Sequence, residues 1–248
     1  MDRLENLDTC LHYLMEQNHV QTEIPTTLDE EQRLLRALMN IWEPQPLSNE
    51  YLTAQDRELQ QQRDEKGIVD PDGTGVLLWQ GDITRLRVDA IVNAANSRML
   101  GCWHPLHSCI DNAIHSAAGL QLRAECEQLM QGTLLPTGEA RITQAYNLPC
   151  RHVIHTVGPI VPTGIPTAEQ EEQLADCYRN CLALAEGYGC HSLAFCCIST
   201  GEFRFPNHRA AEIAIGTVAA AHTTMTVIFN VFKDTDYDIY RQILAARR

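Results

Sequence analysis

The first 72 residues show a pattern of apolar positions that predicts helices. Leucines recur every three or four residues in two segments, the spacing of an amphipathic helix: Leu4, Leu7, Leu11 and Leu14, then Leu34, Leu35 and Leu38. Thr27 followed by Glu30 predicts a capping box for the second helix. A third, strongly polar helix is predicted from Thr53 to Lys66. The turn cluster that follows predicts a boundary between a helical N-terminal extension, 1–72, and a second domain, 73–248.

Beyond this boundary, short apolar runs alternate with longer amphipathic stretches. The predicted strands are Val76–Trp79, Ala90–Val92, Arg141–Thr143, Val153–Val157, Ser192–Ile198 and Thr226–Phe232. The predicted helices are Cys109–Met130, Ala168–Gly187, Asn207–His222 and Tyr237–Ala246. Strand–helix alternation of this kind predicts an α/β fold with helices on both faces of the sheet.

Composition and charge exclude several classes of protein. The 248 residues are 44% hydrophobic and 21% charged, values typical of a globular chain. No apolar run approaches the roughly 18–20 residues of a membrane span, and the first residues do not resemble a secretory signal. We therefore expect a cytoplasmic protein with no membrane partner. The net charge is −13, and an acidic chain gains little from counterion release, so we expect no nucleic-acid partner.

The chain contains ten cysteines, which is many for a reducing compartment. Their spacing does not follow a disulfide framework, and several lie in apolar segments such as Phe195-Cys196-Cys197-Ile198, where a thiol behaves as a small hydrophobe. No Cys-x-x-Cys motif is present, which speaks against a redox-active thiol protein. Cys102 and Cys109 differ from the others because they lie close together with histidine between them.

Two segments carry polar residues at the expected carboxyl ends of strands, where ligands of α/β sheets bind. The first runs from Gly81 through a short strand to Asn93 and Asn96. Asn96 can both donate to and accept from sugar hydroxyls, although the two asparagines are equally consistent with a capped loop. The second, 199–204, reads Ser-Thr-Gly-Glu-Phe-Arg before a predicted helix. Its successive N–H groups suit a diphosphate, with Arg204 adding one charge-assisted contact, but an ordinary strand-to-helix turn has the same pattern.

These segments belong to a series of six motifs that occur in the order found in macrodomains. The motifs are Gly-Asp-Ile-Thr (81–84), Val-Asp-Ala-Ile-Val-Asn-Ala-Ala-Asn-Ser (88–97), Asp-Asn-Ala-Ile-His-Ser-Ala-Ala-Gly (111–119), Thr-Gly-Glu-Ala (137–140), Ile-His-Thr-Val-Gly-Pro (154–159) and Ser-Thr-Gly (199–201). Over about residues 74–248 the chain therefore resembles the macrodomain family. The resemblance implies a three-layer α/β/α sandwich with a mixed sheet, ADP-ribose binding and, as in many members, hydrolysis of ADP-ribose from proteins.

The same resemblance implies roles for individual residues. Asp82 would read the adenine amino group, and Ile83 would offer a backbone N–H nearby. Asn96 would face the ribose next to the scissile bond. The diphosphate would be enclosed by Ser199, Thr200, Gly201, Glu202 and Phe203. Phe232 is the residue expected to stack on adenine, with Asn230 as the alternative.

One segment departs from the usual macrodomain pattern. Where most members have a glycine run, this chain has Cys102-x₄-His107-x-Cys109. In this it resembles the zinc-dependent branch of macrodomains, which also has a helical N-terminal extension. In that branch the genes often accompany a sirtuin-type ADP-ribosyltransferase and a lipoyl-carrier protein. Two thiolates and one imidazole close three corners of a tetrahedron and leave the fourth open; a closed site with His104 as fourth ligand and thiols without any metal are the alternatives.

These observations predict a zinc-dependent hydrolase that removes mono-ADP-ribose from modified proteins. Zn²⁺ on the two cysteines and the histidine would ligate a ribose hydroxyl or a water, with orientation and polarisation as its main effect. Asp111 is the expected water-activating carboxylate, and Asn96 would hold the sugar. His115 and His155 are expected to pack or form hydrogen bonds, and the chain is expected to be a monomer. The alternative function is a reader that binds ADP-ribosylated protein without turnover.

Overall fold

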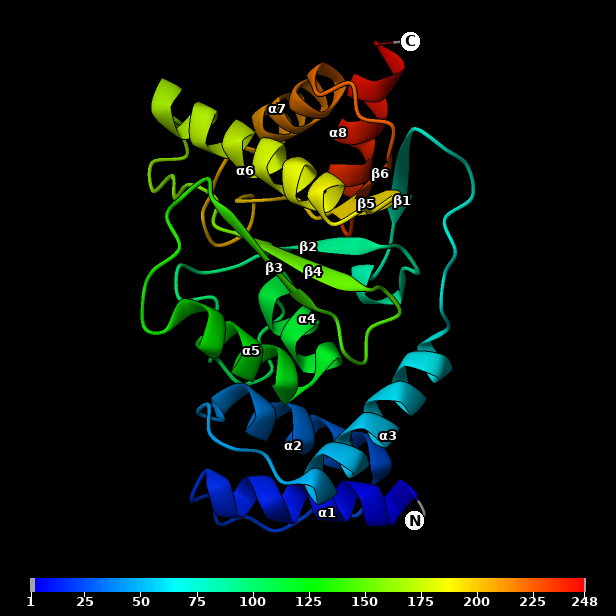
Figure 1. Ribbon diagram of the computed structural model, residues 1–248, viewed down its shortest axis with the longest axis vertical. Helices are drawn as coiled ribbons and strands as arrows, with labels where there is room; N and C mark the ends of the chain where they lie inside the picture. Colours follow the sequence, from blue (N-terminus) through cyan, green and yellow to red (C-terminus); the bar gives the residue numbers. More distant parts are fainter. Residues whose placement is uncertain (1–2, 248) are drawn as a thin grey trace.

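The computed structural model describes residues 3–247, and its N-terminal part consists of three helices. They are α1 (Arg3–Gln17), α2 (Leu28–Ile41) and α3 (Asn49–Lys66), which form the lower part of the molecule in Figure 1. The leucines that predicted the first two helices are their packing faces: Leu7, Leu11, Leu14, Leu35 and Leu38 are fully buried. We refer to α1, α2 and α3 as the N-terminal helical unit.

Two details of these helices differ from the prediction. α3 begins at Asn49 instead of Thr53, because Ser48 is its N-cap and accepts a hydrogen bond from the N–H of Tyr51. The capping box expected at Thr27 and Glu30 is wrong. The Thr27 hydroxyl donates to the Glu30 carboxylate at 2.6 Å, and its oxygen accepts no backbone N–H of the first turn.

The remainder of the chain forms a six-stranded mixed sheet with strand order β1-β6-β5-β2-β4-β3. Only β3 is antiparallel to its neighbour, β4, and the other pairs are parallel. The strands are β1 (Val76–Gln80), β2 (Ala90–Ala94), β3 (Ala140–Gln144), β4 (His152–Thr156), β5 (Ser192–Phe195) and β6 (Thr226–Val231). β2, β5 and β6 are almost entirely buried, as expected of apolar strands covered on both faces. The predicted mixed sheet is confirmed.

Helices cover both faces of the sheet, which confirms the predicted α/β/α layers (Figure 1). One layer contains α4 (Ile110–Ala118) and α5 (Leu120–Met130), and the other contains α6 (Ala168–Gly187), α7 (Asn207–Ala220) and α8 (Asp234–Ala245). The single helix predicted over 109–130 is wrong. It breaks at Gly119, whose φ of +100° lies in the left-handed region and whose surroundings leave no room for a Cβ.

The N-terminal helical unit packs under the layer formed by α4 and α5 (Figure 1). Leu120 of α5 belongs to the same hydrophobic cluster as the leucines of α1 and α2. We refer to the remainder of the chain, from β1 onward, as the sheet domain. Because Leu120 of the sheet domain is part of the hydrophobic cluster of the N-terminal helical unit, the two parts share buried contacts. The domain boundary at residue 72 stays a prediction. In residues 3–247 no helix combines the length and apolar character needed to cross a bilayer.

Candidate active site

The central strand β2 places two asparagines beside one carboxylate. Asn93, the fourth residue of β2, donates to Asp111 Oδ1 at 2.8 Å. Asn96, in the loop after β2, donates to Asp111 Oδ2 at 3.2 Å and to the Gly101 carbonyl at 3.0 Å. Its own Oδ1 accepts the N–H of Arg98, so it also caps the loop. Asn96 and Asp111, both singled out from the sequence, are thus brought into direct contact.

Asp111 lies in the first turn of α4 and is only 5% exposed. Burial raises its pKa to about 6, while the hydrogen bond from Asn93 and the positive charge of Arg123 act in the opposite direction. A carboxylate with a pKa close to neutral is suited to general base catalysis, because it is ionised at pH 7 and still basic enough to accept a proton.

Two histidines lie behind Asp111 in the core. His155 is satisfied on both ring nitrogens, by Asn93 at 3.2 Å and by the Thr143 hydroxyl at 3.0 Å, and burial lowers its pKa to about 3. His115, one turn after Asp111, has Nε2 at 3.5 Å from Asp111 Oδ1, and burial lowers its pKa well below the usual value. His155 is thus a hydrogen-bonded core residue, as predicted, whereas His115 packs in the core without a hydrogen-bond partner for either ring nitrogen among the described residues. Together with Cys126, the two histidines form a buried group of three residues of the types that bind metals. We do not assign a metal to this group, because both ring nitrogens of His155 already have hydrogen-bond partners.

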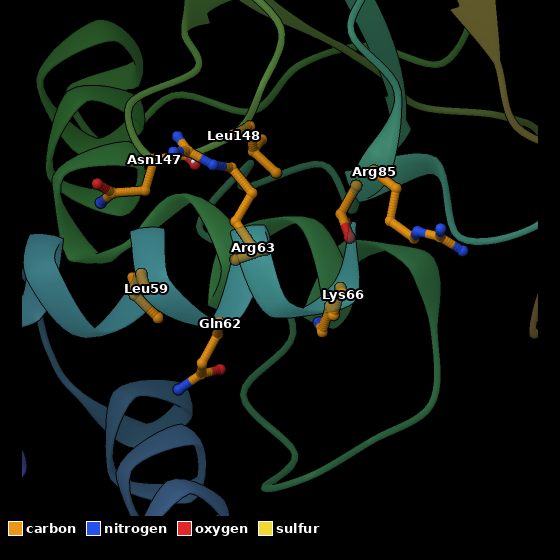
Figure 2. A pocket seen from close by; sticks show the side chains of 9 residues that line it. Leu59, Gln62, Arg63, Lys66, Arg85, Asn147 and Leu148 are labelled. Carbon is orange, nitrogen blue, oxygen red and sulfur yellow. Dashed lines mark hydrogen bonds between the residues drawn. The ribbon is translucent and has the colours of Figure 1, made fainter. Parts of the chain in front are cut away.

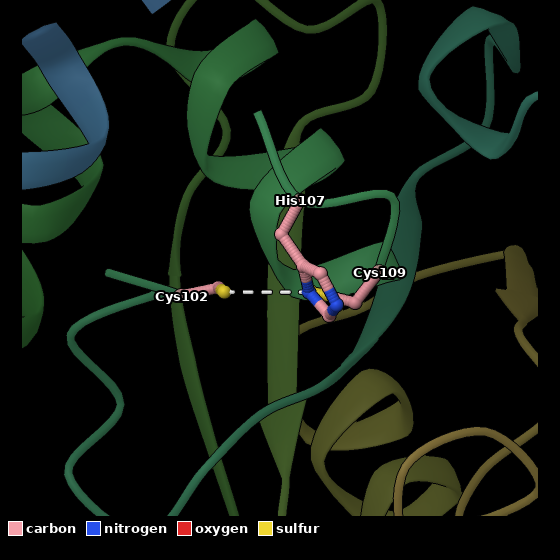
Figure 3. A group of neighbouring side chains, drawn as sticks. All are labelled: Cys102, His107 and Cys109. Atoms are coloured by element: carbon pink, nitrogen blue, oxygen red, sulfur yellow. Dashed lines mark hydrogen bonds between the residues drawn. The ribbon is translucent and has the colours of Figure 1, made fainter. Parts of the chain in front are cut away.

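The predicted metal-ligand residues converge in the loop between β2 and α4. The ligand atoms of Cys102, His107 and Cys109 all lie within 4.8 Å of one another, and Figure 3 shows their side chains facing a common point. Cys102 Sγ is 3.6 Å from His107 Nδ1. Tetrahedral zinc with ordinary Zn–S and Zn–N bonds separates sulfur and nitrogen by about 3.6 Å, so the spacing fits this metal. His104 lies outside the group and contacts the His107 ring edge-on.

The surroundings of Cys109 favour its neutral thiol unless a cation is present. Burial, together with neighbouring Cys102 and Asp111, raises the pKa of the Cys109 thiol to about 12. Without a positive charge nearby, this thiol stays protonated at pH 7. Cys109 is also the N-cap of α4, and its sulfur accepts the Asn112 N–H at 3.4 Å. The helix that carries Asp111 therefore begins at one of the metal-ligand residues.

The loop 199–204 approaches the metal-ligand group from the next strand. The carboxylate of Glu202 is 3.7 Å from His107 Nε2, the ring nitrogen that faces away from Cys102. The Glu202 side chain is 77% exposed, so this is a surface contact between the two loops, longer than a hydrogen bond. The predicted diphosphate loop and the predicted metal loop therefore meet at His107 and Glu202.

The backbone of the 199–204 loop has the form expected of an anion-binding turn. Ser199 and Arg204 have φ angles of +64° and +58°, and the Thr200 hydroxyl donates to the Cys197 carbonyl. Among the described residues, the N–H groups of positions 200–203 have no backbone acceptor. The buried Ser199 Oγ lies so close to Gly158 that a Cβ on that glycine would be 2.0 Å away. Arg204 itself is exposed.

The residues expected at adenine lie at the ends of β1 and β6. Asp82 Oδ1 accepts the Thr84 N–H and hydroxyl and so begins the short 3-10 helix η1 (Ile83–Arg85), in which Ile83 is buried. Phe232 follows β6 and is 75% exposed, which leaves its ring available for stacking. Asn230 is buried and donates to the Gly81 carbonyl, so its side chain is already engaged. The roles of these residues at adenine stay predictions.

A separate hollow lies where α3 meets the sheet domain (Figure 2). It is lined by Leu59, Gln62, Arg63, Lys66, Thr84, Arg85, Ala117, Asn147 and Leu148. None of the residues predicted to bind ADP-ribose or metal is among them. The hollow therefore belongs to the contact between the N-terminal helical unit and the sheet domain, and we assign it no ligand.

Several residues next to the site were missed in the sequence. A hydrogen-bonded group on α2 and α4 contacts the loop that contains Cys102, His107 and Cys109. Its members are Arg36 and Asn40 of α2 and Asn112 of α4. Arg36 and Asn40 are four residues apart and therefore on one face of α2. That face is also largely buried. Two polar residues on the packed side of a helix are a signal that could have indicated a polar contact with another part of the chain.

The mixed sheet, the asparagine strand with its carboxylate and the Ser-Thr-Gly turn together define a macrodomain. The chain belongs to this family: the family model described as Macro domain matches residues 92–214. It is 48% identical over 262 residues to a protein-ADP-ribose hydrolase of Treponema medium, covering 99% of this chain and all of that protein.

Solved structures agree with this assignment. An Oceanobacillus iheyensis macrodomain with ADP is 40% identical and superposes with a TM-score of 0.63 over 68% of this chain and 90% of that one. A Trypanosoma brucei macrodomain in complex with ADP-ribose is 30% identical, with a TM-score of 0.62 over 84% of this chain and 94% of that one. The chain is therefore similar along nearly its whole length to a protein-ADP-ribose hydrolase, and over 68% to 84% of its length to macrodomains solved with ADP or ADP-ribose.

Proposed function

We propose that this chain is a zinc-dependent hydrolase that removes mono-ADP-ribose from modified proteins and releases ADP-ribose. The protein-ADP-ribose hydrolase to which it is 48% identical matches it from end to end, which supports the hydrolase activity. The observation that carries the zinc dependence is the position of Cys109. It is a member of the Cys102–His107–Cys109 group and also the N-cap of the helix that carries Asp111.

The residues present fit zinc in chemistry and spacing. Two thiolates and an imidazole are soft to borderline ligands, and three protein ligands with an open fourth position are typical of catalytic zinc. When bound, the metal would supply a Lewis acid beside the ribose. His107 would use Nδ1 as the ligand atom, since that nitrogen faces Cys102, and the negative charge of Glu202, 3.7 Å from Nε2, would favour a proton on Nε2.

The protein side chains account for the other parts of the reaction. The loop 199–203 binds the diphosphate through backbone N–H groups, and Asn96 holds the ribose next to the scissile bond. Asp111 accepts a proton from the attacking water as the new bond to C1″ forms. The bond between C1″ and the acceptor side chain breaks, and the acceptor leaves with the electron pair. Where the acceptor is a carboxyl side chain, the bond that breaks is a labile ester and a carboxylate leaves without needing a proton, so positioning and one general base are the main contributions required.

The proposal extends to the biological setting. The modified protein would come from an ADP-ribosyltransferase of the sirtuin type, with a lipoyl-carrier protein as one candidate acceptor, as the resemblance to the zinc-dependent branch implies. We place the reaction in the cytoplasm, because all ten cysteines are free thiols and free thiols persist in a reducing compartment. We propose that the chain acts as a monomer.

A turnover assay on an automodified ADP-ribosyltransferase tests this function. We expect release of ADP-ribose, loss of release after treatment with a strong chelator, and recovery on adding Zn²⁺. Binding of ADP-ribose without release would favour the alternative, a reader of ADP-ribosylated protein. Release that is insensitive to the chelator, in a protein shown to be free of metal, would leave the hydrolase but exclude the zinc dependence.

A further inference from the structure

The middle of α2 lies against the metal loop, which we define as residues 101–109. Arg36 donates from Nε and Nη2 to the side-chain oxygen of Asn112, at 3.0 and 2.7 Å. Its Nη2 also donates to the backbone carbonyl of His107 at 3.0 Å. One guanidinium of the N-terminal helical unit therefore contacts both a metal-ligand residue and the first turn of α4.

Asn40, one turn further along α2, completes this contact. It is fully buried, and its Oδ1 accepts the Leu106 N–H at 2.9 Å and the side-chain amide of Asn112 at 3.0 Å. Leu106 has a φ of +58°, a left-handed conformation that costs a non-glycine residue about 1 kcal/mol or more. Such a conformation persists where the surroundings hold it. Asn40 holds it next to His107.

α2 is itself anchored to the sheet domain by Arg123 of α5. The buried guanidinium donates to the carbonyls of Met39, Asn40 and Trp42, at 2.8 to 3.1 Å. Among the described residues, the Met39 carbonyl also accepts the Trp42 N–H, whereas the carbonyls of Asn40 and Trp42 have no backbone donor. The same guanidinium lies 4.5 Å from the centre of the Trp103 ring, next to Cys102. The loop is thus contacted near both ends.

From these contacts we infer that Arg36 and Asn40 are positioning residues for the metal loop, and that the N-terminal helical unit is part of the metal site. They touch neither the metal position nor the substrate and act through His107, Leu106 and Asn112. The inference rests on the proposed function in one respect, that the loop holds zinc. A pre-organised ligand loop loses less conformational freedom when the metal binds, so its metal affinity is higher.

Zinc affinity of the metal-stripped full chain, measured by competition with a chromophoric chelator, tests this inference. Arg36→Gln removes the charge and the forked contact, and we expect affinity to fall at least tenfold, within the roughly 10–100-fold range of outer-shell contacts. Arg36→Lys keeps the charge but cannot contact Asn112 and His107 together, so we expect an intermediate loss. Arg33→Gln is the matched control on the exposed side of the same helix, and we expect less than a twofold change. Equal affinities for Arg36→Gln and Arg33→Gln would overturn the inference.

Amide hydrogen exchange of the metal-free protein provides a readout that needs neither zinc nor activity. We expect the N–H groups of Leu106 and His107 to exchange at least tenfold faster in Arg36→Gln and in Asn40→Ala than in Arg33→Gln. If Asn40→Ala does not fold, the Arg36 series decides alone. If the wild-type chain binds no zinc, the proposed function fails. In that case, equal exchange at these two amides in the Arg36 and Arg33 variants separately overturns the positioning role.

Discussion

The side-chain amide of Asn96 donates a hydrogen bond to the carboxylate of Asp111 at 3.2 Å, although the metal loop separates the two residues in the chain. The same amide donates to the Gly101 carbonyl, so Asn96 connects the start of the metal loop to the helix that follows it. The residue proposed to hold the ribose therefore also orients the residue proposed to activate water. Changes at either position are expected to affect the other.

Replacement of Asp111 by Asn keeps the shape of the side chain and removes its basicity. We expect the rate of ADP-ribose release to fall by about 10²–10⁴-fold, the contribution of a general base, with ADP-ribose affinity within threefold of wild type. Zinc content should be unchanged, because Asp111 is outside the metal group. Single-turnover kinetics, calorimetric titration and metal analysis measure these three quantities.

Asp70→Asn is a suitable control, because this carboxylate is exposed and pairs with Arg87 on the surface. We expect its rate to equal that of wild type. An Asp111→Asn protein that retains more than a tenth of the wild-type rate would show that another group activates the water.

Replacement of Cys102 by Ala should separate turnover from binding. One thiolate fewer leaves His107 and Cys109, too few ligands for tight zinc binding, whereas the loop at 199–203 lies on another strand. We expect metal content near zero, turnover reduced at least a hundredfold and ADP-ribose affinity within tenfold. Cys190→Ala, outside the metal group, is the control. A metal-free Cys102→Ala protein with near-wild-type turnover would mean that zinc has no part in the reaction.

The order of strands and helices could be predicted from the sequence because hydrophobic periodicity is a local property. The break at Gly119 could not, because the apolar pattern continues through it from α4 into α5. Gly119 adopts a φ of +100°, which a continuous helix does not accommodate, and hydrophobic periodicity carries no information on backbone angles. The prediction of a capping box at Thr27 is wrong for a different reason. Thr and Glu three residues apart can form either the backbone hydrogen bonds of a capping box or a direct bond between their side chains, and the sequence does not tell which of the two forms.

The candidate site shows the same limit. Cys102, His107 and Cys109 could be predicted as a group because they lie within eight residues of one another. Arg36 and Asn40 could not be connected to that loop, because they lie more than sixty residues earlier and arginine on a helix usually faces solvent. Contacts between distant segments depend on how the N-terminal helical unit packs, and periodicity does not report that packing.

Deletion of residues 1–70 should destabilise the sheet domain. It exposes Leu120 and leaves Arg123 without its three carbonyl partners. Loss of one buried leucine contact and these hydrogen bonds is worth about 3–5 kcal/mol, which corresponds to a fall in Tm of roughly 10 °C for a domain of this size. Differential scanning calorimetry of the full and shortened chains measures it. An unchanged Tm would show that the sheet domain does not depend on the N-terminal helical unit for its stability.

The stability of the chain should depend on pH through His155. Burial lowers its pKa to about 3 in the folded state, against about 6.5 when unfolded. The unfolded chain therefore binds the additional proton, and the stability from keeping His155 neutral is present above pH 6.5 and lost as pH falls toward 3. Its contribution is about 1.4 kcal/mol per pH unit in this window.

The variant His155→Gln isolates the contribution of His155 to the pH dependence of stability, since His115 and Asp111 are present in both proteins. Urea unfolding at pH 6.5, 5.5 and 4.5 gives the free energy of unfolding of both proteins. As the pH falls, this free energy should decrease less steeply in the variant, by about 1.4 kcal/mol per pH unit, the effect of one proton. Parallel curves for the two proteins would mean that His155 is protonated in the folded state.

Replacement of Gly158 by Ala should weaken ADP-ribose binding indirectly, by displacing the neighbouring loop 199–204. A Cβ at this position would lie 2.0 Å from Ser199 Oγ and 2.7 Å from Ile198 Cγ2, so the start of the 199–204 loop must move. Displacement of the loop proposed to bind the diphosphate would misalign several of its N–H groups at once, and we expect affinity to fall at least tenfold, about 1.4 kcal/mol. Gly187→Ala, at the end of α6 with open space around it, is the matched control and should leave affinity unchanged. Isothermal titration of both variants with ADP-ribose makes the comparison, and equal affinities would show that the loop adapts to the added methyl group or does not bind the diphosphate.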